Sequence, residues 1–408
     1  MIGAGIGGLT LALCLHRAGI GVQVFEQASE VKELGVGINT LPHAIKELDA
    51  LGLLERLDAV AIRTKELIYQ TATGQEILRQ PRGTWAGYEV PQFSIHRGML
   101  QKVLYDAVIE RLGPEAVVTD RRLVSYAQDD TGVGVELASR EGGAHRVEGD
   151  ILVGADGIHS SIRTGRHPEQ GAPRWSGIVI WRGATWAEPF LTGQSMIIAG
   201  GLSAKLVLYP IHNSPDRPGQ TLMNWAICGK VAEDGAPLTL IDDWSKQARV
   251  EDVMPYVDGH IAIGELDVGA LIRATPEIYV YPMCDRDPLE CWSDGRVTLL
   301  GDAAHPMYPV GSNGASQAIL DAVALSRHLD ESGTAGLSAY DEERRPATAE
   351  IVRANRKGGP ERVIDLVEAR APHGFRDLSD VATDDELTAI VGSYQKIAGF
   401  TTAQVNRG

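Results

Sequence analysis

The sequence predicts an α/β fold in which a parallel-sheet domain is interrupted by an inserted antiparallel β-sheet and followed by C-terminal helices. Three observations support this prediction. Glycine-rich turns join apolar runs to helical patterns near residues 3–8, 154–163 and 301–314. Short strand-like runs dominate residues 175–282, and helical periodicity dominates residues 312–371. Strands and helices that alternate around a β-rich block are typical of layered α/β proteins.

The composition is that of an ordinary globular protein. The chain has 408 residues, of which 44% are hydrophobic and 23% charged, and this length allows two or three domains. A net charge of -16 without a Lys/Arg run predicts no nucleic-acid binding. No stretch reaches the roughly 18 apolar residues of a membrane span, so no stable membrane association is expected. Four cysteines without metal-ligand spacing predict a reduced, cytoplasmic protein without a metal site.

The first glycine-rich turn reads GAGIGG and precedes a predicted helix over residues 5–18 and a predicted strand over residues 21–26 that ends in Glu26. Such glycines permit a tight turn, let the backbone approach a pyrophosphate and let the helix pack on the sheet. An acid at the end of the next strand can bind ribose hydroxyls. The order indicates a dinucleotide site rather than a simple Gly-rich turn. Its glycines are Gly3, Gly5 and Gly8.

Only Met1 and Ile2 precede this turn. Such a motif usually follows a strand of about five or six residues. We therefore expect weaker cofactor retention and lower stability than in a chain with a longer segment before Gly3. Equal melting temperature and flavin content in an N-terminally extended chain would contradict this expectation.

Two further segments are candidates for cofactor contacts. Gly35 and Gly37 lie before a predicted helix over residues 42–48, where their backbone can approach a flat ring; a plain connecting loop is the alternative. Arg97 begins a predicted helix, with Gln101 one turn later. An arginine there can bind a pyrophosphate bidentately, although a solvated helix charge is nearly as good an interpretation.

The second glycine-rich turn, GADGIHSSIR at residues 154–163, follows a predicted buried strand over residues 150–154. Asp156 lies at the turn, and Ser160 and Ser161 can cap the helix that follows. The bland alternative is that Asp156 is only a turn residue. Three glycine turns that bear an acid make coincidence a weaker explanation.

The third turn, GDAAHPMYPVGSNG at residues 301–314, follows the apolar run at residues 297–300. Asp302 can accept hydrogen bonds from ribityl hydroxyls. The free N–H groups of the next helix can stabilise negative charge on a reduced ring. Because nucleotide signatures lie at both ends of the chain, one large ligand, FAD, fits best. The residues that open this helix are Gly311, Ser312, Asn313 and Gly314.

The middle of the chain is expected to supply a substrate site. Its predicted strands cover residues 177–183, 195–199, 205–209, 222–228 and 278–281, with helical patches at 240–248 and 250–256. Aromatic residues on these strands can line a flat pocket for an aromatic substrate, although core packing is commoner for any one of them. The candidates for catalysis are Arg182, Tyr209 and His212. His305 is a further acid/base candidate, or it orients the loop after Asp302.

These segments together resemble the class A flavoprotein aromatic monooxygenases, the single-component p-hydroxybenzoate-hydroxylase-like group. The resemblance rests on the three glycine-rich motifs and covers residues 3–355. Many members end the third motif with Gly-Gln-Gly, whereas Asn313 stands here between Ser312 and Gly314. With WRG at residues 181–183, this variant is most similar to the phenazine-modifying branch.

The resemblance implies roles for the candidate residues. Glu26 would bind the adenosine ribose, Arg97 and Gln101 the pyrophosphate or ribityl region, and Asp302 the ribityl chain. Asp156 would serve FAD and the transient binding of NADH or NADPH, and the amides of residues 312–314 would face the flavin ring. The implied reaction is hydroxylation of an electron-rich aromatic or N-heteroaromatic, through a flavin hydroperoxide formed with O2. Where a carboxylate sits on the attacked carbon, decarboxylation can accompany it, and Arg182 is the candidate for charge contacts.

The resemblance also implies a domain division. We expect a discontinuous, Rossmann-like FAD-binding domain of residues 1–70, 97–170 and 290–371, and a substrate domain of residues 71–96 and 171–289. Residues 372–408 would form a tail with a loop and one helix. The protein would be a monomer or a homodimer. The alternatives are another FAD oxidoreductase, such as an oxidase or a ring reductase, and a non-catalytic protein on the same fold.

Overall fold

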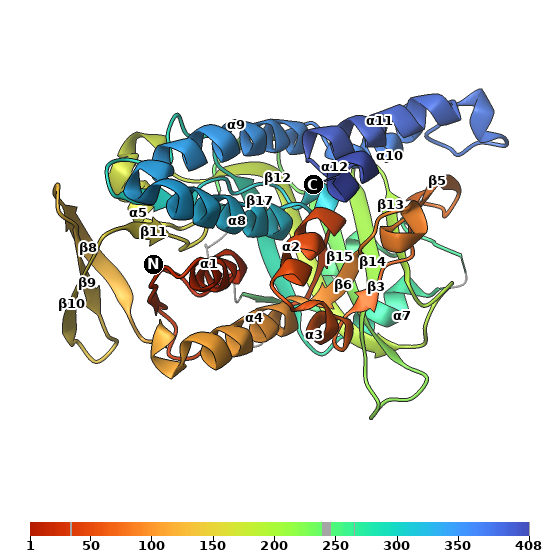
Figure 1. Ribbon diagram of the computed structural model, residues 1–408. Coiled ribbons are helices and arrows are strands. Elements are labelled where there is room, and N and C mark those ends of the chain that lie inside the picture. The colour runs from red at the N-terminus through yellow and green to blue at the C-terminus, as the bar shows by residue number, and fades with distance from the viewer. Residues whose placement is uncertain (33–34, 239–245, 265, 408) are drawn as a thin grey trace.

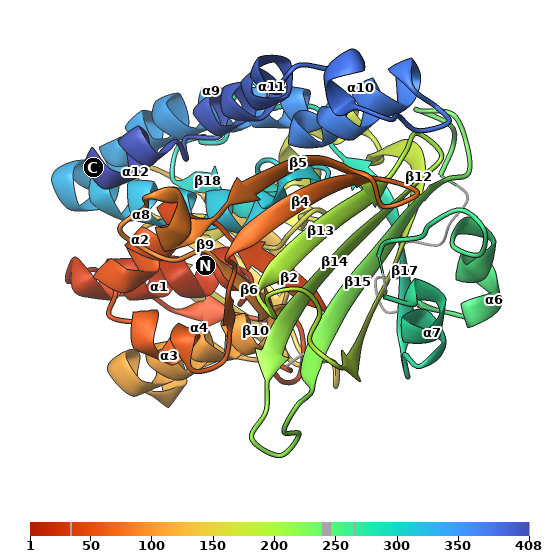
Figure 2. The same cartoon turned by 90° about the vertical axis from the view of Figure 1, so that its right-hand side faces the viewer.

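The computed structural model describes residues 1–32, 35–238, 246–264 and 266–407 (Figure 1). It confirms the α/β class. A parallel sheet with its helices occupies one side of the molecule, a large β-sheet occupies the other, and C-terminal helices lie across both (Figures 1 and 2).

The parallel sheet carries the glycine-rich turns. Its strands are β1 (Val24–Phe25), β7 (Val117–Val118), β11 (Leu152–Gly154) and β18 (Val297–Leu299). β1 pairs with β7, and β11 pairs with β18, in both cases in parallel. Ile2 bridges Phe25 on one side and Gly154 on the other, again in parallel. Met1 and Ile2 therefore occupy the centre of this sheet, at the place where a longer strand was expected.

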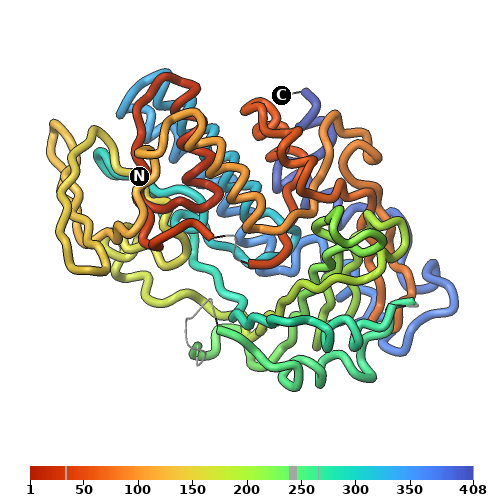
Figure 3. Tube along the Cα trace, turned by 90° about the horizontal axis from the view of Figure 1, so that it is seen from below, coloured from red at the N-terminus to blue at the C-terminus, as the bar shows by residue number. Residues whose placement is uncertain are grey.

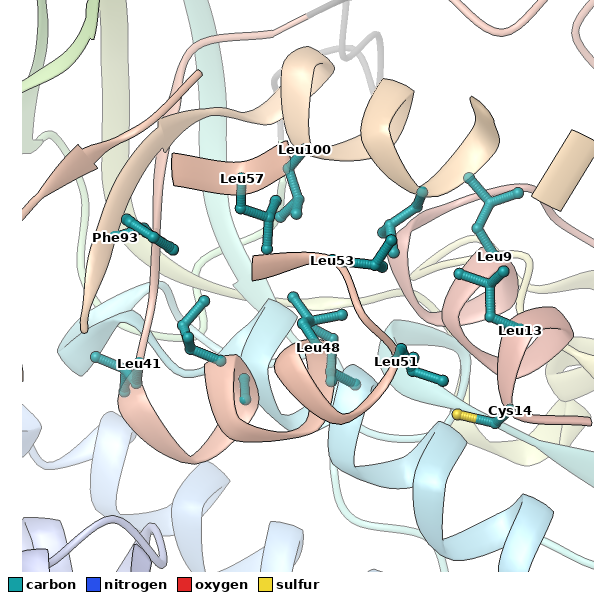
Figure 4. Packing of buried hydrophobic residues seen from close by; sticks show 14 of the residues in the cluster. Leu9, Leu13, Cys14, Leu41, Leu48, Leu51, Leu53, Leu57, Phe93 and Leu100 are labelled. Carbon is teal, nitrogen blue, oxygen red and sulfur yellow. The ribbon is translucent and has the colours of Figure 1, made fainter. Parts of the chain in front are cut away.

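Helix α1 (Ile6–Arg17) packs between α4 (Arg97–Leu112) and α8 (Gly314–Ser332). Figure 3 shows the consequence: red and blue segments from opposite ends of the sequence lie side by side. The buried face of α1 presents Leu9, Leu13 and Cys14 to a leucine-rich core (Figure 4). Burial of each leucine contributes on the order of 2 kcal/mol, so this core fixes α1 relative to the sheet. Its other members include Leu41, Leu48, Leu51, Leu53, Leu57, Phe93 and Leu100.

The large sheet runs in the order β16-β17-β12-β15-β14-β13-β4-β5 (Figure 2). Every neighbouring pair is antiparallel except β13 and β4, which are parallel. The strands are β4 (Glu66–Thr71), β5 (Glu76–Pro81), β12 (Arg174–Ala187), β13 (Ser195–Gly200), β14 (Ala204–Asn213), β15 (Thr221–Lys230), β16 (Gln247–Ala248) and β17 (Ile278–Asp285). The segment that enters this sheet therefore begins at Glu66, a few residues before the expected boundary at residue 71.

Different elements pack against the two faces of the large sheet. One face packs against α6 (Val250–Val253) and α7 (Val268–Arg273). The β4–β13–β14 half of the other face packs against α10 (Arg362–Arg370) and α11 (Asp384–Ile397). The rest of that second face packs against the loop around Tyr308 and Val310. This arrangement brings the large sheet to the third glycine motif.

The remaining elements complete the chain. A small sheet has the order β2 (Gly37–Thr40), β6 (Phe93–His96) and β3 (Ile62–Arg63). Another sheet, β8 (Arg122–Gln128), β9 (Val133–Ala138) and β10 (Ala144–Gly149), projects at the left of Figure 1. The other α-helices are α2 (Pro42–Ala50), α3 (Leu54–Asp58), α5 (Ser161–Arg166), α9 (Gly336–Arg356) and α12 (Thr402–Arg407). Among the described residues, no helix is both long and apolar enough for a membrane crossing.

Three expectations need correction. The predicted helical patch at residues 240–248 lies mostly outside the described residues, and its last two form strand β16 because they pair with β17. Gly37 begins strand β2 instead of lying in a loop. The C-terminal segment holds two α-helices, α11 and α12, not one, because Val391 and Val405 are buried in the cores.

Candidate cofactor and substrate site

The three acids singled out in the sequence all follow strands of the parallel sheet. Glu26 comes directly after β1, Asp156 follows β11, and Asp302 follows β18. Because these strands and Ile2 are parallel neighbours, their carboxyl ends meet at one edge, with Gly3 between the first two. Ligands of open α/β sheets bind at this edge. The sheet therefore gathers the acids and the first glycine turn in one place.

The glycines of the first turn are needed for different physical reasons. A Cβ on Gly3 would lie 2.3 Å from the Ala155 carbonyl oxygen, and a Cβ on Gly8 would lie 2.2 Å from the Gly3 carbonyl oxygen. Both positions therefore serve the packing of the turn and helix α1 on the sheet. A Cβ on Gly5 would meet nothing within 4 Å. Gly5 is the N-cap of α1 and has no side-chain cap, so free N–H groups face open space there.

Glu26 and Gln101 hold the first turn from two sides. The Glu26 carboxylate accepts hydrogen bonds from the backbone amides of Ala4, at 2.9 Å, and Ala28, at 2.8 Å. Gln101 Nε2 donates to the Ala4 carbonyl at 2.8 Å. Next to Glu26 lies a cavity of about 540 Å³. Its lining also includes Asp120, Arg122, Ser139 and Arg140, which sequence reasoning did not single out.

Asp156 stabilises its own turn and keeps one oxygen unpaired. Its Oδ2 accepts from the backbone amide of Ser161 at 2.9 Å and from the Ser161 hydroxyl at 3.2 Å. Its Oδ1 is buried and has no hydrogen-bond partner among the described residues. Burial raises the pKa of Asp156. Ser160 Oγ accepts from the Arg163 amide at 3.0 Å, so the predicted helix cap is confirmed.

Arg163 is the main residue of this turn that sequence reasoning missed. It is not a surface charge, because only 1% of the residue is exposed. Its guanidinium donates to the carbonyls of Ala303, at 3.1 Å, and Ala304, at 2.6 Å. It thus fastens the turn of Asp156 to the loop of Asp302, a contact over a long sequence separation that no local pattern reveals.

Behind the Asp302 loop lies a buried ionic network. Asp321 of α8 accepts hydrogen bonds from the Gly301 amide at 3.1 Å and from Arg344 Nε at 2.8 Å. His305 Nε2 lies 2.5 Å from the same carboxylate. Burial raises the pKa of Asp321, but the charges of His305 and Arg344 outweigh it and hold that pKa below its ordinary value. This placement favours the second interpretation of His305, as a residue that orients the loop.

Asp302 itself faces open space within the fold. Its side chain is exposed, yet enough protein surrounds it that desolvation raises its pKa. The charges of His305 and Arg97 act to lower the pKa of Asp302, so both residues lie within electrostatic range of its carboxylate. An accessible acid in such a recess is suited to accept hydrogen bonds from a bound polyol.

The helix start after this loop has a left-handed turn. Gly311 and Ser312 have φ values of 68° and 58°. Asn313 is fully buried, and its Nδ2 donates to the Gly311 carbonyl at 3.2 Å and to the Tyr394 hydroxyl at 3.0 Å. The Asn313 side chain therefore points into the protein. A Cβ on Gly314 would meet nothing within 4 Å, so the first turn of α8 faces open space.

Gly35 and Gly37 contact other candidate residues. Gly35 has a φ of 110°, and the Arg97 side chain lies 3.5 Å from the place of its missing Cβ. A Cβ on Gly37 would lie 2.6 Å from the Asn224 side chain, whose Oδ1 accepts the Gly37 amide at 2.8 Å. Arg182 donates to the Gly37 carbonyl. The missing side chain of Gly37 thus makes room for the large sheet.

The sheet face that meets Gly37 carries Arg182 and Tyr209. Tyr209 lies directly opposite Asn224 in the β14–β15 register, and its hydroxyl is within electrostatic range of Arg182. Burial raises the pKa of Tyr209. Next to these polar groups lies a buried apolar patch where the loop around Tyr308 packs on the sheet. We call this patch the apolar floor: Ile180, Ala226, Met283, Tyr308 and Val310.

His212 is the candidate that the structure places apart from these groups. Its Nδ1 lies 3.1 Å from the Val60 carbonyl, and its ring packs edge-on against Trp186 at 6.2 Å between centroids. A β-bulge between Pro210 and His212 shifts the register of β14 at this point. Within the described residues no group of His, Cys, Asp or Glu could hold a metal ion.

The residues at the sheet edge fit FAD. Open helix starts at Gly5 and Gly314 suit the pyrophosphate and an electron-rich ring, and the accessible Asp302 suits the ribityl chain. The cavity beside Glu26 is large enough for a nucleoside end. These features lie far apart in the sequence but come together in the fold because α1 packs against α8.

Comparison with known proteins agrees with this geometry. Residues 1–180 and 281–355 match the family described as FAD binding domain. The chain is 45% identical to the phenazine 1,6-dicarboxylic acid hydroxylase PhzS of Lysobacter antibioticus, over 98% of this chain and 97% of that protein. It is 32% identical to 3-hydroxybenzoate 6-hydroxylase 1 of Aquipseudomonas alcaligenes, over 86% and 85% of the two chains. The fold is similar to that of Klebsiella pneumoniae HpxO complexed with FAD and uric acid, with a TM-score of 0.71 at 23% identity over 100% of this chain and 94% of that one.

Proposed function

Since this chain belongs to the FAD binding domain family, we propose that, as an FAD- and NAD(P)H-dependent aromatic monooxygenase, it hydroxylates a phenazine carboxylic acid. The observation that carries the substrate class is the 45% identity to a phenazine dicarboxylate hydroxylase, which extends over nearly the full length of both chains. The position of Arg182 on the large sheet supports it, because an anionic aromatic substrate needs a cation.

The carboxyl edge of the parallel sheet would hold the cofactor. Gly5 and the start of α1 would bind its pyrophosphate on a turn that Gly3 and Gly8 allow to pack closely, and Arg97 and Gln101 would add contacts. Glu26 and the adjoining cavity hold the adenosine end. When bound, FAD carries electrons from NADH or NADPH to O2 and so supplies the oxidising power.

The flavin half of the site comes from later parts of the chain. Asp302 binds the ribityl hydroxyls, and the amides of residues 311–314 stabilise negative charge beside the ring. Gly35 and Gly37 line its other side. The turn of Asp156 serves the cofactor region and its reductant. The common sheet edge of Asp156 and Asp302 supports these assignments.

The large sheet supplies the substrate side. The large sheet beside the apolar floor holds the flat ring system, and Arg182 binds its negative charge. Tyr209 lies close to Arg182. His305 acts through the Asp321 network as a positioning residue for the Asp302 loop. We assign the substrate domain to residues 66–96 and 171–289, because β4 pairs within the large sheet.

We also infer a cytoplasmic monomer or homodimer. Within the described part of the chain the four cysteines form no disulfide, which suits a reducing compartment. Sedimentation of the purified protein distinguishes the two oligomeric states.

The test is substrate-dependent oxidation of NADH and NADPH by the FAD-loaded protein. Phenazine-1,6-dicarboxylate, phenazine-1-carboxylate and 3-hydroxybenzoate are compared under ¹⁸O-labelled O2. We expect the phenazine acids to stimulate oxidation most and one labelled oxygen atom to appear in the product. Stimulation by 3-hydroxybenzoate alone would overturn the substrate class. Oxidation without labelled product would overturn the monooxygenase assignment.

A further inference from the structure

Two buried hydrogen-bond networks hold the loop that connects β18 to α8, and one side chain joins them. At the first end of the loop, the Asp321 carboxylate accepts from the Gly301 amide at 3.1 Å. At the second end, the Asn313 side chain donates to the Gly311 carbonyl at 3.2 Å. Gln317 of α8 is 1% exposed and contacts both networks.

The contact toward the first end runs through Arg344 of α9. Its Nε donates to Asp321 at 2.8 Å, and one of its terminal nitrogens donates to Gln317 Oε1 at 2.6 Å. A guanidinium can only donate, so the Gln317 atom that faces it must be the oxygen. The orientation of the Gln317 amide is thereby fixed, and its NH2 group points away from Arg344.

The NH2 group of Gln317 faces acceptors. Its Nε2 lies 3.1 Å from the Ala398 carbonyl oxygen and 3.3 Å from both Asn313 Oδ1 and His43 Nε2. Burial, and then the charge of Arg344, lower the pKa of His43 to about 3, so its ring is neutral and its Nε2 can accept. Gln317 is therefore a donor toward Asn313 and an acceptor toward Arg344.

Asn313 passes this constraint on to the backbone of the loop. Because its Oδ1 faces Gln317, its Nδ2 faces the Gly311 carbonyl and the Tyr394 hydroxyl. The intervening Ser312 has a left-handed backbone, which persists only where its surroundings hold it. A turned Asn313 amide would lose both contacts of its Nδ2 and would free the backbone before the open first turn of α8.

We propose that Gln317 is a positioning residue for the bound flavin, because it holds the two ends of this loop in one arrangement. The inference rests on the proposed function, which assigns the loop to FAD. Asp302 at the first end would bind the ribityl chain, and the amides of residues 311–314 at the second end would stabilise charge on the reduced ring. One cofactor can use both ends only if their spacing is held, and a satisfied buried network makes such a spacing rigid.

The decisive variant is Gln317→Glu. It keeps an oxygen to accept the Arg344 guanidinium but places its second oxygen against Asn313 Oδ1 and the Ala398 carbonyl. It therefore breaks the link on the Asn313 side alone. Gln317→Met is the second variant, because it keeps the length of the side chain and removes the amide without adding charge.

Gln75→Glu and Gln75→Met are the matched controls. Gln75 lies between β4 and β5, outside the loop, and its amide is also hydrogen-bonded on both sides. Its Nε2 donates to the Phe375 carbonyl at 2.7 Å, and its Oε1 accepts the Phe375 amide at 3.2 Å. The same substitutions at Gln75 therefore report the general cost of losing a glutamine amide.

Two measurements on the FAD-loaded protein test the role of Gln317. Hydrogen–deuterium exchange follows the backbone amides of residues 301–314, and spectroelectrochemistry gives the reduction potential of the bound flavin. In both Gln317 variants we expect these amides to exchange about tenfold faster, the loss typical of one buried hydrogen bond. We also expect the affinity for reduced flavin to fall about tenfold relative to oxidised flavin, which lowers a two-electron potential by about 30 mV. The Gln75 variants should match the wild type in both measurements.

Unchanged exchange and an unchanged potential in Gln317→Glu would overturn the positioning role. Equal changes in the Gln75 variants would overturn it as well, because they would show a general loss of stability. If Gln317→Glu fails to fold, the same two measurements on Gln317→Met decide. A wild-type protein that binds no FAD would refute the proposed function and this inference with it, whereas an FAD-binding wild type with indifferent Gln317 variants refutes the positioning role alone.

Discussion

The Tyr394 hydroxyl lies 3.0 Å from the side-chain nitrogen of Asn313 and so joins α11 to the start of α8. The same hydroxyl lies 2.7 Å from Asn355 Oδ1, and Asn355 Nδ2 donates to the Tyr308 carbonyl at 2.9 Å. All three side chains are buried. This chain of hydrogen bonds holds the loop before α8 from the side opposite the open space.

Replacement of Tyr394 by Phe tests this link. The ring would still fill the space beside Gly311, but the hydroxyl and its hydrogen bonds would be lost. We expect the free energy of unfolding to fall by about 1–2 kcal/mol and the Kd for FAD to rise several-fold. Urea unfolding and flavin fluorescence titration measure the two effects.

Tyr88→Phe is the control for Tyr394→Phe. The Tyr88 hydroxyl is also buried and donates to the Phe400 carbonyl at 2.5 Å, so its bond reaches the segment before α12 and not the start of α8. A similar loss of stability with unchanged FAD affinity is expected. Equal FAD affinity in both variants would contradict a role of Tyr394 in the cofactor loop.

The two glycines Gly5 and Gly8 should respond differently to alanine. Gly8→Ala places a methyl group against the Gly3 carbonyl and should lower the melting temperature of the cofactor-free protein by several degrees. Gly5→Ala meets no protein atom, so the cofactor-free protein should melt as the wild type does. It should nevertheless lose most of its FAD affinity, because its methyl group enters the space that we assign to the pyrophosphate. Wild-type FAD binding by Gly5→Ala would contradict that assignment.

The Asp302→Asn variant should bind FAD more weakly but be more stable without FAD. Burial raises the pKa of Asp302 in the cofactor-free protein, so the ionised carboxylate opposes folding. The destabilisation by this carboxylate appears as the pH rises from the ordinary pKa, about 4, through the raised pKa of the folded protein. The variant lacks this charge, so at neutral pH its cofactor-free form should have a higher melting temperature than the wild type. Added FAD should raise its melting temperature less. Thermal unfolding with and without FAD tests both parts. A lower melting temperature of the cofactor-free variant would argue against the assigned environment.

Asp321→Asn removes the charge that His305 and Arg344 share. A buried ion pair broken on one side costs about 3–5 kcal/mol, which urea unfolding at neutral pH measures. Because the pKa of Asp321 is lowered, its contribution is complete above the ordinary value near 4 and is lost as the pH falls through the lowered one. Glu343→Gln, on a partly exposed carboxylate paired with Arg327, should cost less than about 1 kcal/mol. Equal losses of unfolding free energy in Asp321→Asn and Glu343→Gln would contradict a stabilising role of the buried network.

Local sequence patterns predict where the acids of the parallel sheet lie. Asp156 and Asp302 stand beside an apolar run and a glycine, and Glu26 ends the next apolar run after a glycine turn and a helix, so all three positions could be found without a structure. Parallel strands then place their carboxyl ends together whatever the intervening chain does.

Contacts between distant segments could not be predicted in this way. Arg163 reaches Ala304, and Asn224 reaches Gly37, across separations in sequence over which no periodicity operates. The parallel pairing of β4 with β13 likewise joins segments more than 120 residues apart in sequence. Such residues look ordinary in the sequence because their importance arises only from the partner that the fold provides.

The packing of α1 against α8 has a consequence for the synthesis of the protein. The glycine turn at Gly3 leaves the ribosome long before Tyr394, the residue that braces the loop completing the site. Tight capture of the cofactor must therefore wait until Tyr394 has emerged. Until α8 emerges, the leucine-lined face of α1 lacks one of its packing partners.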